Sequence, residues 1–330
     1  MKLLTYIPKQ GKEKNLRIGL LHGENSVIDL QSAAILYLRE VQREKDPGRI
    51  ASEIIPHDMV AFLSRGPEAF DLASRTAVFM AGFSSHPKDH LKDPDGRPVL
   101  FGLQEVEIEA PVPRPGKIIA MGLNFMSHVV ENQTDPPEYP VGFLKAPSSV
   151  VGPYDPVPYP RATKQLDYEV ELAVIIGRKG KEIPKERAWD HIAGYCILND
   201  LSARDLQAKE MKKRLILLSK SLDGLGPMGP WLVTRDEIPD PDSLLMELYV
   251  NDEKEPRQRA CTREMIFKIP DLVHYWSQMT LEPGDIITSG TPAGIGLYRK
   301  PDPEAWLLKP GDVVRAKIEK LGEIRNRIVS

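Results

Sequence analysis

The sequence has few cysteines, no long apolar run and no excess of charge of one sign. Its two cysteines, Cys196 and Cys261, provide neither a disulfide framework nor a zinc cluster, and this usage is typical of a reduced cytoplasm. The longest apolar runs, such as residues 172–176, are far too short to span a bilayer, and no secretory signal follows Met1. The formal net charge of -3 favours neither nucleic acid nor an anionic membrane as a partner. We therefore expect a cytoplasmic protein without either partner.

The chain is long for a single compact core. Its 330 residues are enough for two domains. Residues 111–116 contain three prolines, which is typical of a stiff linker. We therefore expect a small N-terminal domain over residues 1–112 and a larger domain over residues 113–330.

The two parts differ in their patterns of apolar residues. The first predicts short strands around turns at Gly11 and residues 23–25, then helices, with a polar loop at residues 86–98. Its strands are expected at 3–7, 16–21 and 27–30, and its helices at 32–43, 56–63 and 67–80. The second part predicts strands at 117–121, 168–176, 194–198, 231–234, 245–250, 285–289 and 312–318, with helices at 202–213 and 269–279. This order predicts an α+β fold that is mostly β.

Three acidic residues stand at the ends of two apolar segments. Glu169 and Glu171 are two apart in residues 166–176, a strand by composition, so both side chains point to one face. Such close carboxylates repel each other unless water screens them on an exposed face or a cation binds them. Asp200 follows the strand at 194–198 and is either a cap or turn residue, or a third ligand if the strands are neighbours. Three carboxylates without His or Cys suit a hard divalent cation rather than zinc.

A histidine and a glutamate are spaced for contact on a helix. One helical turn would place His128 beside Glu131. A carboxylate can orient an imidazole as a general base, but a surface His–Glu pair has the same spacing. The proline-rich residues 134–140 that follow form either a mobile lid over a site or an ordered loop.

Two glycine-rich segments need separate interpretations. Residues 288–296 form a turn whose N–H groups and Thr291 hydroxyl could bind a carboxylate, or simply a tight turn with unusual backbone angles. Residues 224–229 match the G-x-G-x-x-G pattern, but a strand follows where dinucleotide binding needs a helix, so we exclude that function. Lys220, just before the second segment, is either a surface charge or a site residue.

From Lys117 to the C-terminus the chain resembles the fumarylacetoacetate hydrolase family. The resemblance rests on several motifs in the family's order, among them Asp-Tyr-Glu-Val-Glu-Leu at 167–172 and Gly-Thr-Pro-Ala-Gly at 290–294. Further matches lie at 122–125 with His128, 194–205, 229–231, 281–285 and 309–312. It implies a β-sandwich roll catalytic domain with a smaller N-terminal α+β domain, and a homodimer.

The resemblance also implies roles for individual residues. It assigns Mg²⁺ or Mn²⁺, with Ca²⁺ as another occupant, to three acidic residues: Glu169, Glu171 and Asp200. It assigns catalysis to His128 and Glu131, which belong to a lid that closes on substrate, together with Lys220. It assigns substrate contacts to five residues: Lys220, Thr291, Gly290, Arg204 and Gln207.

We predict from these roles a hydrolase that cleaves a carbon–carbon bond in a small 1,3-diketo acid, an acylpyruvate or a fumarylacetoacetate-like compound. His128 with Glu131 would deprotonate a water that attacks the distal carbonyl, and the enolate that leaves would be stabilised at the metal and by Lys220. The same site would serve a decarboxylase or isomerase of 2-oxo dicarboxylates, of the oxaloacetate or 2-hydroxyhepta-2,4-diene-1,7-dioate type, or a dehydratase of keto-deoxy sugar acids. A metal-stabilised binding protein is the non-enzyme alternative, but it would have no need of a base.

Overall fold

A computed structural model describes residues 1–9, 15–83 and 91–330. The turn predicted at Gly11 and the first part of the loop predicted at 86–98 lie outside these residues. Among the helices described, none is long and apolar enough to cross a membrane.

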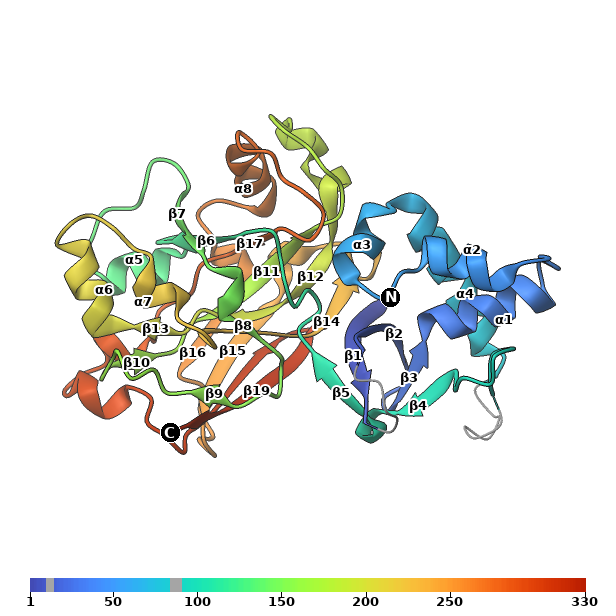
Figure 1. The fold of residues 1–330 in the computed structure, drawn as a ribbon. Coiled ribbons are helices and arrows are strands. Elements are labelled where there is room, and N and C mark those ends of the chain that lie inside the picture. The colour runs from blue at the N-terminus through green and yellow to red at the C-terminus, as the bar shows by residue number, and fades with distance from the viewer. Residues whose placement is uncertain (10–14, 84–90) are drawn as a thin grey trace.

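The N-terminal part combines strands with helices that gather at one end of the molecule (Figure 1). Its strands are β1 (Lys2–Pro8), β2 (Arg17–His22), β3 (Ser26–Asp29), β4 (Leu100–Gly102) and β5 (Val106–Glu109). Its helices are α1 (Leu30–Glu40), α2 (Pro47–Ile54), α3 (Met59–Ser64) and α4 (Pro67–Ala81). The predicted helix at 56–63 begins later, at Met59, because the side chain of Asp58 accepts a hydrogen bond from the N–H of Ala61 and caps α3 there. Helix α2 was not predicted.

One continuous sheet joins the N-terminal part to the rest of the chain. Its order is β4-β3-β2-β1-β14-β12-β11-β17-β6-β7, with β5 beside β1 and β8 beside β14. The junction is the antiparallel pair of β1 with β14, where Leu3 faces Leu232. The segment between β5 and β6 contains the predicted boundary at residue 112, but the sheet crosses from one side of this boundary to the other. The division into two domains stays a prediction.

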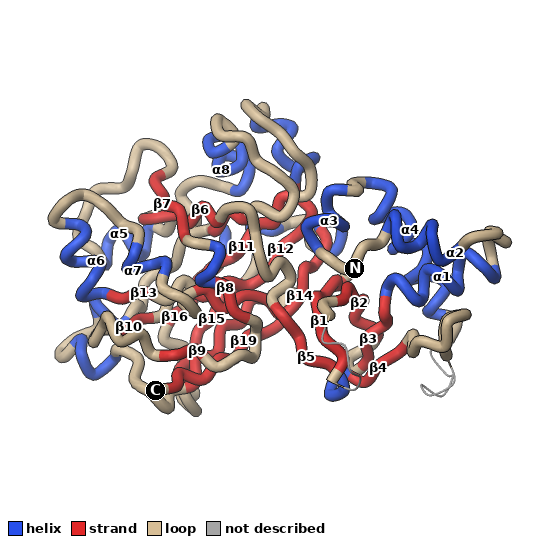
Figure 2. The backbone as a smooth tube through the Cα atoms, viewed as in Figure 1, coloured by secondary structure: helices blue, strands red, loops and turns tan. Residues whose placement is uncertain are grey.

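The larger part contains a second sheet that packs against the first (Figure 2). The remaining strands of the first sheet are β6 (Ile118–Gly122), β7 (Val141–Lys145), β8 (Val150–Val151), β11 (Val170–Ile176), β12 (Ile192–Asn199), β14 (Gly226–Thr234) and β17 (Ile286–Thr288). The second sheet has the order β16 (Gln258–Cys261), β15 (Leu245–Val250), β18 (Val313–Ile318), β19 (Gly322–Val329), β9 (Val157–Pro158). The predicted α+β, mostly β class is confirmed.

Strand β11 is buried on both faces, and this burial explains its apolar composition. Leu172 and Val174 pack in the core between the two sheets. Ala173 and Ile175 pack in the core formed with the N-terminal helices. Because side chains alternate along a strand, Glu171 shares a face with Ala173 and Ile175. The metal-ligand candidates therefore enter the interior of the molecule.

Four short helices complete the larger part: α5 (Met126–Glu131), α6 (Arg204–Met211), α7 (Leu218–Ser221) and α8 (Ile269–Trp276). The helix predicted at 202–213 begins only at Arg204, because β13 (Ser202–Ala203) pairs with β10 (Leu166–Asp167). The rejected glycine pattern lies largely in strand β14, which confirms that no helix opens from it. Helices α5, α6 and α7 lie beside β7, at the end of the molecule away from α1, α2 and α4 (Figure 1).

Candidate active site and metal centre

Two antiparallel strands bring the three predicted acidic ligands together. Val170, the first residue of β11, pairs with Asn199, the last residue of β12. Glu169, just before β11, and Asp200, just after β12, therefore lie side by side. The N–H of Asp200 donates to the carbonyl oxygen of Glu169 at 2.8 Å. One carboxylate oxygen from each of Glu169, Glu171 and Asp200 lies within 4.8 Å of the others, and all three side chains are buried. The neighbouring strands that the sequence interpretation required are present.

Three buried cations surround this triad. Lys220 Nζ donates to Glu169 Oε2 at 2.7 Å and to Asp200 Oδ2 at 2.8 Å. Lys145 Nζ donates to Asp200 Oδ1 at 2.8 Å and also to the carbonyl oxygen of Lys220. Arg204 Nη2 donates to Glu169 Oε1 at 2.7 Å. Both oxygens of Glu169 and both of Asp200 therefore accept charge-assisted hydrogen bonds. Lys220 is not the surface charge that was the alternative interpretation.

The pKa values of Glu169 and Glu171 are shifted in opposite directions. Burial would raise the pKa of Glu169, but the charges of Lys220 and Arg204 outweigh burial and lower that pKa to about 2. Burial, followed by the charges of Asp200 and Glu169, raises the pKa of Glu171 well above its ordinary value. In the described structure neither oxygen of Glu171 accepts a hydrogen bond.

A hard divalent cation fits this arrangement. The three candidate ligand atoms are carboxylate oxygens, the ligand type that hard divalent cations prefer. Both carboxylate oxygens of Glu171 are buried without a hydrogen-bond partner in the described structure. A bound cation would supply the partner that such buried groups require. The residues present are therefore consistent with the predicted metal.

The predicted His–Glu pair faces the same region from helix α5. His128 Nδ1 lies 3.1 Å from Glu131 Oε2, and Glu131 Oε1 accepts a hydrogen bond from the N–H of Gly294 at 2.8 Å. This leaves the Nε2 atom of His128 available for other contacts. The side chain of His128 lines a cavity of about 360 Å³ that Glu169 also lines.

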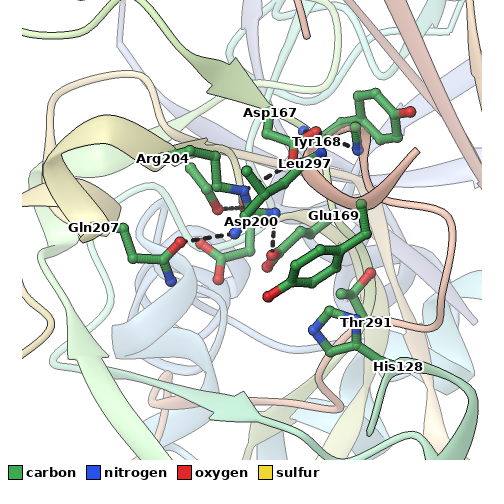
Figure 3. A network of polar contacts seen from close by, with 12 residues as sticks. His128, Asp167, Tyr168, Glu169, Asp200, Arg204, Gln207, Thr291 and Leu297 are labelled. Carbon is green, nitrogen blue, oxygen red and sulfur yellow. Dashed lines mark hydrogen bonds and ion pairs between the residues drawn. The ribbon is translucent and has the colours of Figure 1, made fainter. Parts of the chain in front are cut away.

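The cavity also brings together most of the predicted substrate contacts. Arg204, Gln207, Lys220 and Thr291 all line it. In Figure 3, Arg204 and Gln207 lie on one side of Glu169, and His128 and Thr291 lie on the other. A small acid in this cavity would therefore meet hydrogen-bond donors from several elements and a base from α5.

The glycine-rich turn is held tightly at its first residues. The Thr291 hydroxyl donates to the carbonyl oxygen of Val170 at 3.0 Å and accepts from Gln258 Nε2 at 2.8 Å. Gly290 has a φ of 76°, and a side chain there would come within 3.2 Å of the Asn124 Cβ atom. The interpretation as a tight turn that needs glycine is confirmed. Binding of a carboxylate by Gly290 and Thr291 stays a prediction.

These motifs and this geometry coincide with one protein family. Residues 117–329 match the family model described as fumarylacetoacetate (FAA) hydrolase C-terminal. The chain belongs to the fumarylacetoacetate hydrolase family. The resemblance found in the sequence is thereby confirmed.

Several members of the family are similar over almost the whole chain. An oxaloacetate tautomerase of Bacillus subtilis, YisK, is 37% identical over 316 residues, which cover 94% of this chain and 95% of that protein. A mitochondrial oxaloacetate tautomerase of Rattus norvegicus is 40% identical over 276 residues, 83% of this chain and 80% of the relative. Among solved structures, a fumarylacetoacetate hydrolase from Exiguobacterium antarcticum has a TM-score of 0.73 at 33% identity and covers 100% of this chain and 99% of its own. A maleylpyruvate hydrolase from Sphingobium has a TM-score of 0.71 at 27% identity, with coverage of 100% and 99%.

Two residues that organise the site of this family member were not predicted. Asp167 accepts hydrogen bonds from Arg204 Nε at 2.8 Å and from the N–H of Gly296 at 2.8 Å, so it fixes the guanidinium against the glycine-rich turn. Lys145 ends strand β7 and is almost completely buried beside Asp200. Asp167 was part of a quoted motif, and its position before Glu169 and Glu171 was a usable signal. For Lys145 the only signal was its place at the end of an apolar segment.

The Lys145–Asp200 pair gives a stability prediction for the metal-free protein. Burial lowers the pKa of Lys145 although Asp200 opposes this effect, so the ammonium depends on its partners. Lys145→Met would leave Asp200 Oδ1 buried without this donor, and breaking a buried pair costs about 3–5 kcal/mol. Lys179→Met is the control, because the Lys179–Glu282 pair is exposed to solvent and should contribute little to stability. Denaturant unfolding in excess chelator measures both; equal, small effects would contradict the prediction.

Proposed function

We propose that the protein catalyses keto–enol tautomerisation of a small 2-oxo dicarboxylate of the oxaloacetate type. The observation that carries the proposal is a His128–Glu131 pair and a buried acidic triad on one cavity, with Lys220 and Arg204 beside them. The similarity to oxaloacetate tautomerases over 94% and 83% of the chain supports this reaction over the hydrolysis expected first.

The chain's own residues supply the proton transfer. His128 Nε2 would remove a proton from carbon 3 of the keto form, and the electron pair of the broken C–H bond would form the double bond between carbons 2 and 3. The oxygen on carbon 2 would then carry the negative charge until it takes a proton from the imidazolium or from water. Glu131 bound to Nδ1 would orient the imidazole and favour its charged form during the transfer.

Buried cations would stabilise the charge that develops on the substrate oxygen. Lys220 lies on the cavity wall. Burial alone would lower its pKa, but the charges of Asp200 and Glu169 outweigh burial and raise it, so the ammonium stays protonated. A fixed ammonium in a site with little water is a strong electrostatic stabiliser of an enolate. Arg204 and Gln207 would bind a substrate carboxylate.

A divalent cation, Mg²⁺ or Mn²⁺, would be held by Glu169, Glu171 and Asp200. When bound, it supplies Lewis-acid polarisation of a 2-oxo acid. A structure similar to this chain, a maleylpyruvate hydrolase at 27% identity and a TM-score of 0.69, is described in complex with manganese and pyruvate, which supports this assignment.

Hydrolytic cleavage of an acylpyruvate is the second candidate. The similarity to a maleylpyruvate hydrolase favours it, and the same base would activate water instead of removing a carbon-bound proton. The homodimer and the cytoplasmic location inferred from the sequence remain proposals alongside either reaction.

A comparison of substrates tests the proposal. The loss of enol absorbance would be followed after oxaloacetate is added to the protein with Mg²⁺, Mn²⁺ or excess chelator, and a panel of acylpyruvates would be assayed for pyruvate. We expect metal-dependent acceleration of tautomerisation over buffer. Acylpyruvate cleavage without accelerated tautomerisation would replace the proposal with the second candidate. Turnover of neither substrate, despite measured metal binding, would contradict both.

A further inference from the structure

Helix α5 reaches the glycine-rich turn and the residues after it through three polar side chains. The hydroxyl of Ser127 accepts a hydrogen bond from the N–H of Ala293 at 3.3 Å. Glu131 accepts one from the N–H of Gly294 at 2.8 Å. At the end of the helix, the hydroxyl of Tyr298 donates to Oδ1 of Asn132. Every contact of this set connects α5 to residues 293–298.

Residues 294–298 are themselves held by hydrogen bonds to Arg299 and to the buried residues Tyr168 and Asp167. The carbonyl oxygen of Gly294 accepts hydrogen bonds from Arg299 Nε at 3.1 Å and from the Tyr168 hydroxyl at 3.3 Å. The N–H of Gly296 donates to Asp167, which is completely buried. This segment therefore offers α5 a rigid support.

Helix α5 has little to hold it in place on its own. It has six residues and no side-chain hydrogen bond at its N-terminus. Two of its apolar side chains are largely exposed, Met126 at 47% and Val130 at 69%. Because so short a helix is marginal in water, its orientation depends on its tertiary contacts.

We propose that Tyr298 is a positioning residue that acts on His128 through Asn132. Asn132 caps the C-terminus of α5, and its N–H donates to the carbonyl oxygen of His128 at 2.9 Å, so the Tyr298 hydroxyl is bound to the turn that carries the base. The Tyr298 ring also lines the cavity, with its centroid 6.2 Å from that of His128. The inference rests on the proposed role of His128 as the base.

Removing the hydroxyl alone tests the positioning role. Tyr298→Phe keeps the ring in the cavity wall, and we expect kcat to fall about tenfold with KM changed less than about twofold, because a misplaced base slows the chemical step without weakening substrate binding. Tyr249→Phe is the control: Tyr249 lies on β15 beside Arg315, outside the cavity wall, and should leave both constants unchanged. A raised KM with unchanged kcat would show that the hydroxyl contacts substrate, and would overturn the proposal.

Two further variants identify the route of the effect. In a double-mutant cycle, Asn132→Ala should lower kcat little further in the Tyr298→Phe background, because both substitutions remove the same Tyr298–Asn132 hydrogen bond. In a His128→Ala background, Tyr298→Phe should have no further effect on the residual rate. Additive losses in either test would mean that Tyr298 acts independently of Asn132 or of the base, contrary to the proposal.

Hydrogen exchange separates this inference from the proposed reaction. The amides of Val129 and Asn132 are hydrogen-bonded within α5, and we expect both to exchange faster in Tyr298→Phe than in the wild type or in Tyr249→Phe. Unchanged exchange would overturn the positioning role whatever the substrate. Faster exchange in a protein that turns over neither oxaloacetate nor an acylpyruvate would uphold the contact and contradict the reaction. Faster exchange with unaltered kcat would overturn the effect on catalysis.

Discussion

His128→Ala is expected to lower kcat by about 10²–10⁴-fold, the usual contribution of a general base, while metal affinity stays near that of the wild type. Both oxygens of Glu169 and of Asp200 are bound by Lys220, Lys145 or Arg204, so the position of these ligands does not depend on the imidazole. Initial rates with oxaloacetate and calorimetric titration with Mn²⁺ would measure the two quantities.

The control for this variant is another histidine without a role in the cavity. His191 is hydrogen-bonded to the carbonyl oxygen of Arg178 at an exposed position, and His191→Ala should leave both quantities unchanged. If His128→Ala instead lost turnover and metal binding to the same extent, the separation of base and metal ligands would be wrong. An unchanged kcat would remove His128 from the mechanism.

The sequence predicted the acidic triad because its geometry depends mainly on local rules. The two-residue spacing of Glu169 and Glu171 places them on one face of a strand. Asp200 lies near them because β11 and β12 are consecutive strands of the first sheet and pair antiparallel. The contact of His128 with Glu131 likewise follows from helical spacing.

The cations around the triad depend on long-range packing, which no local pattern reveals. Lys145 meets Asp200 from the edge strand β7, 55 residues away, and Lys220 meets Glu169 across 51 residues. A lysine after an apolar segment is usually exposed, so burial of Lys145 contradicts the ordinary preference of its residue type. Of these two lysines, the family resemblance assigned a role to Lys220 alone.

The predictions of fold elements also failed where the local signal was weak or where the contact joins distant parts of the sequence. Helix α2 was missed although Asp46 and Pro47 form an N-terminal signal, since its eight residues have one fully buried side chain. Strand β19 was missed although its burial alternates strictly from Ile324 to Ile328. The pairing of β1 with β14 joins residues more than 200 positions apart, and nothing in either segment specifies the partner.

Glu171→Gln is expected to weaken metal binding by at least about 100-fold. Substitution of a residue that only hydrogen-bonds to a metal ligand already lowers metal affinity by about 10–100-fold. Glutamine keeps the shape of the side chain but removes the charge, and Glu171 has no hydrogen-bond donor in the described structure to compensate for the lost cation. Titration with Mn²⁺ would measure the loss. Wild-type affinity in the variant would exclude Glu171 as a ligand.

The same variant should stabilise the metal-free protein, and Glu169→Gln should do the opposite. The pKa of Glu171 is raised in the folded state, so its contribution to stability is lost as pH rises above the ordinary value of 4.5, and Gln avoids that loss at neutral pH. The pKa of Glu169 is lowered to about 2, so its contribution is present above 4.5 and lost as pH falls towards 2. Glu169→Gln would also remove one of the two carboxylate partners of Lys220, which keeps Asp200, and of Arg204, which keeps Asp167, and weakening these buried pairs destabilises the fold. Thermal unfolding in chelator at neutral pH would compare the variants. Both should lose the metal, but their melting temperatures at neutral pH should move in opposite directions; shifts of the same sign would mean that Lys220 and Arg204 do not distinguish the two carboxylates.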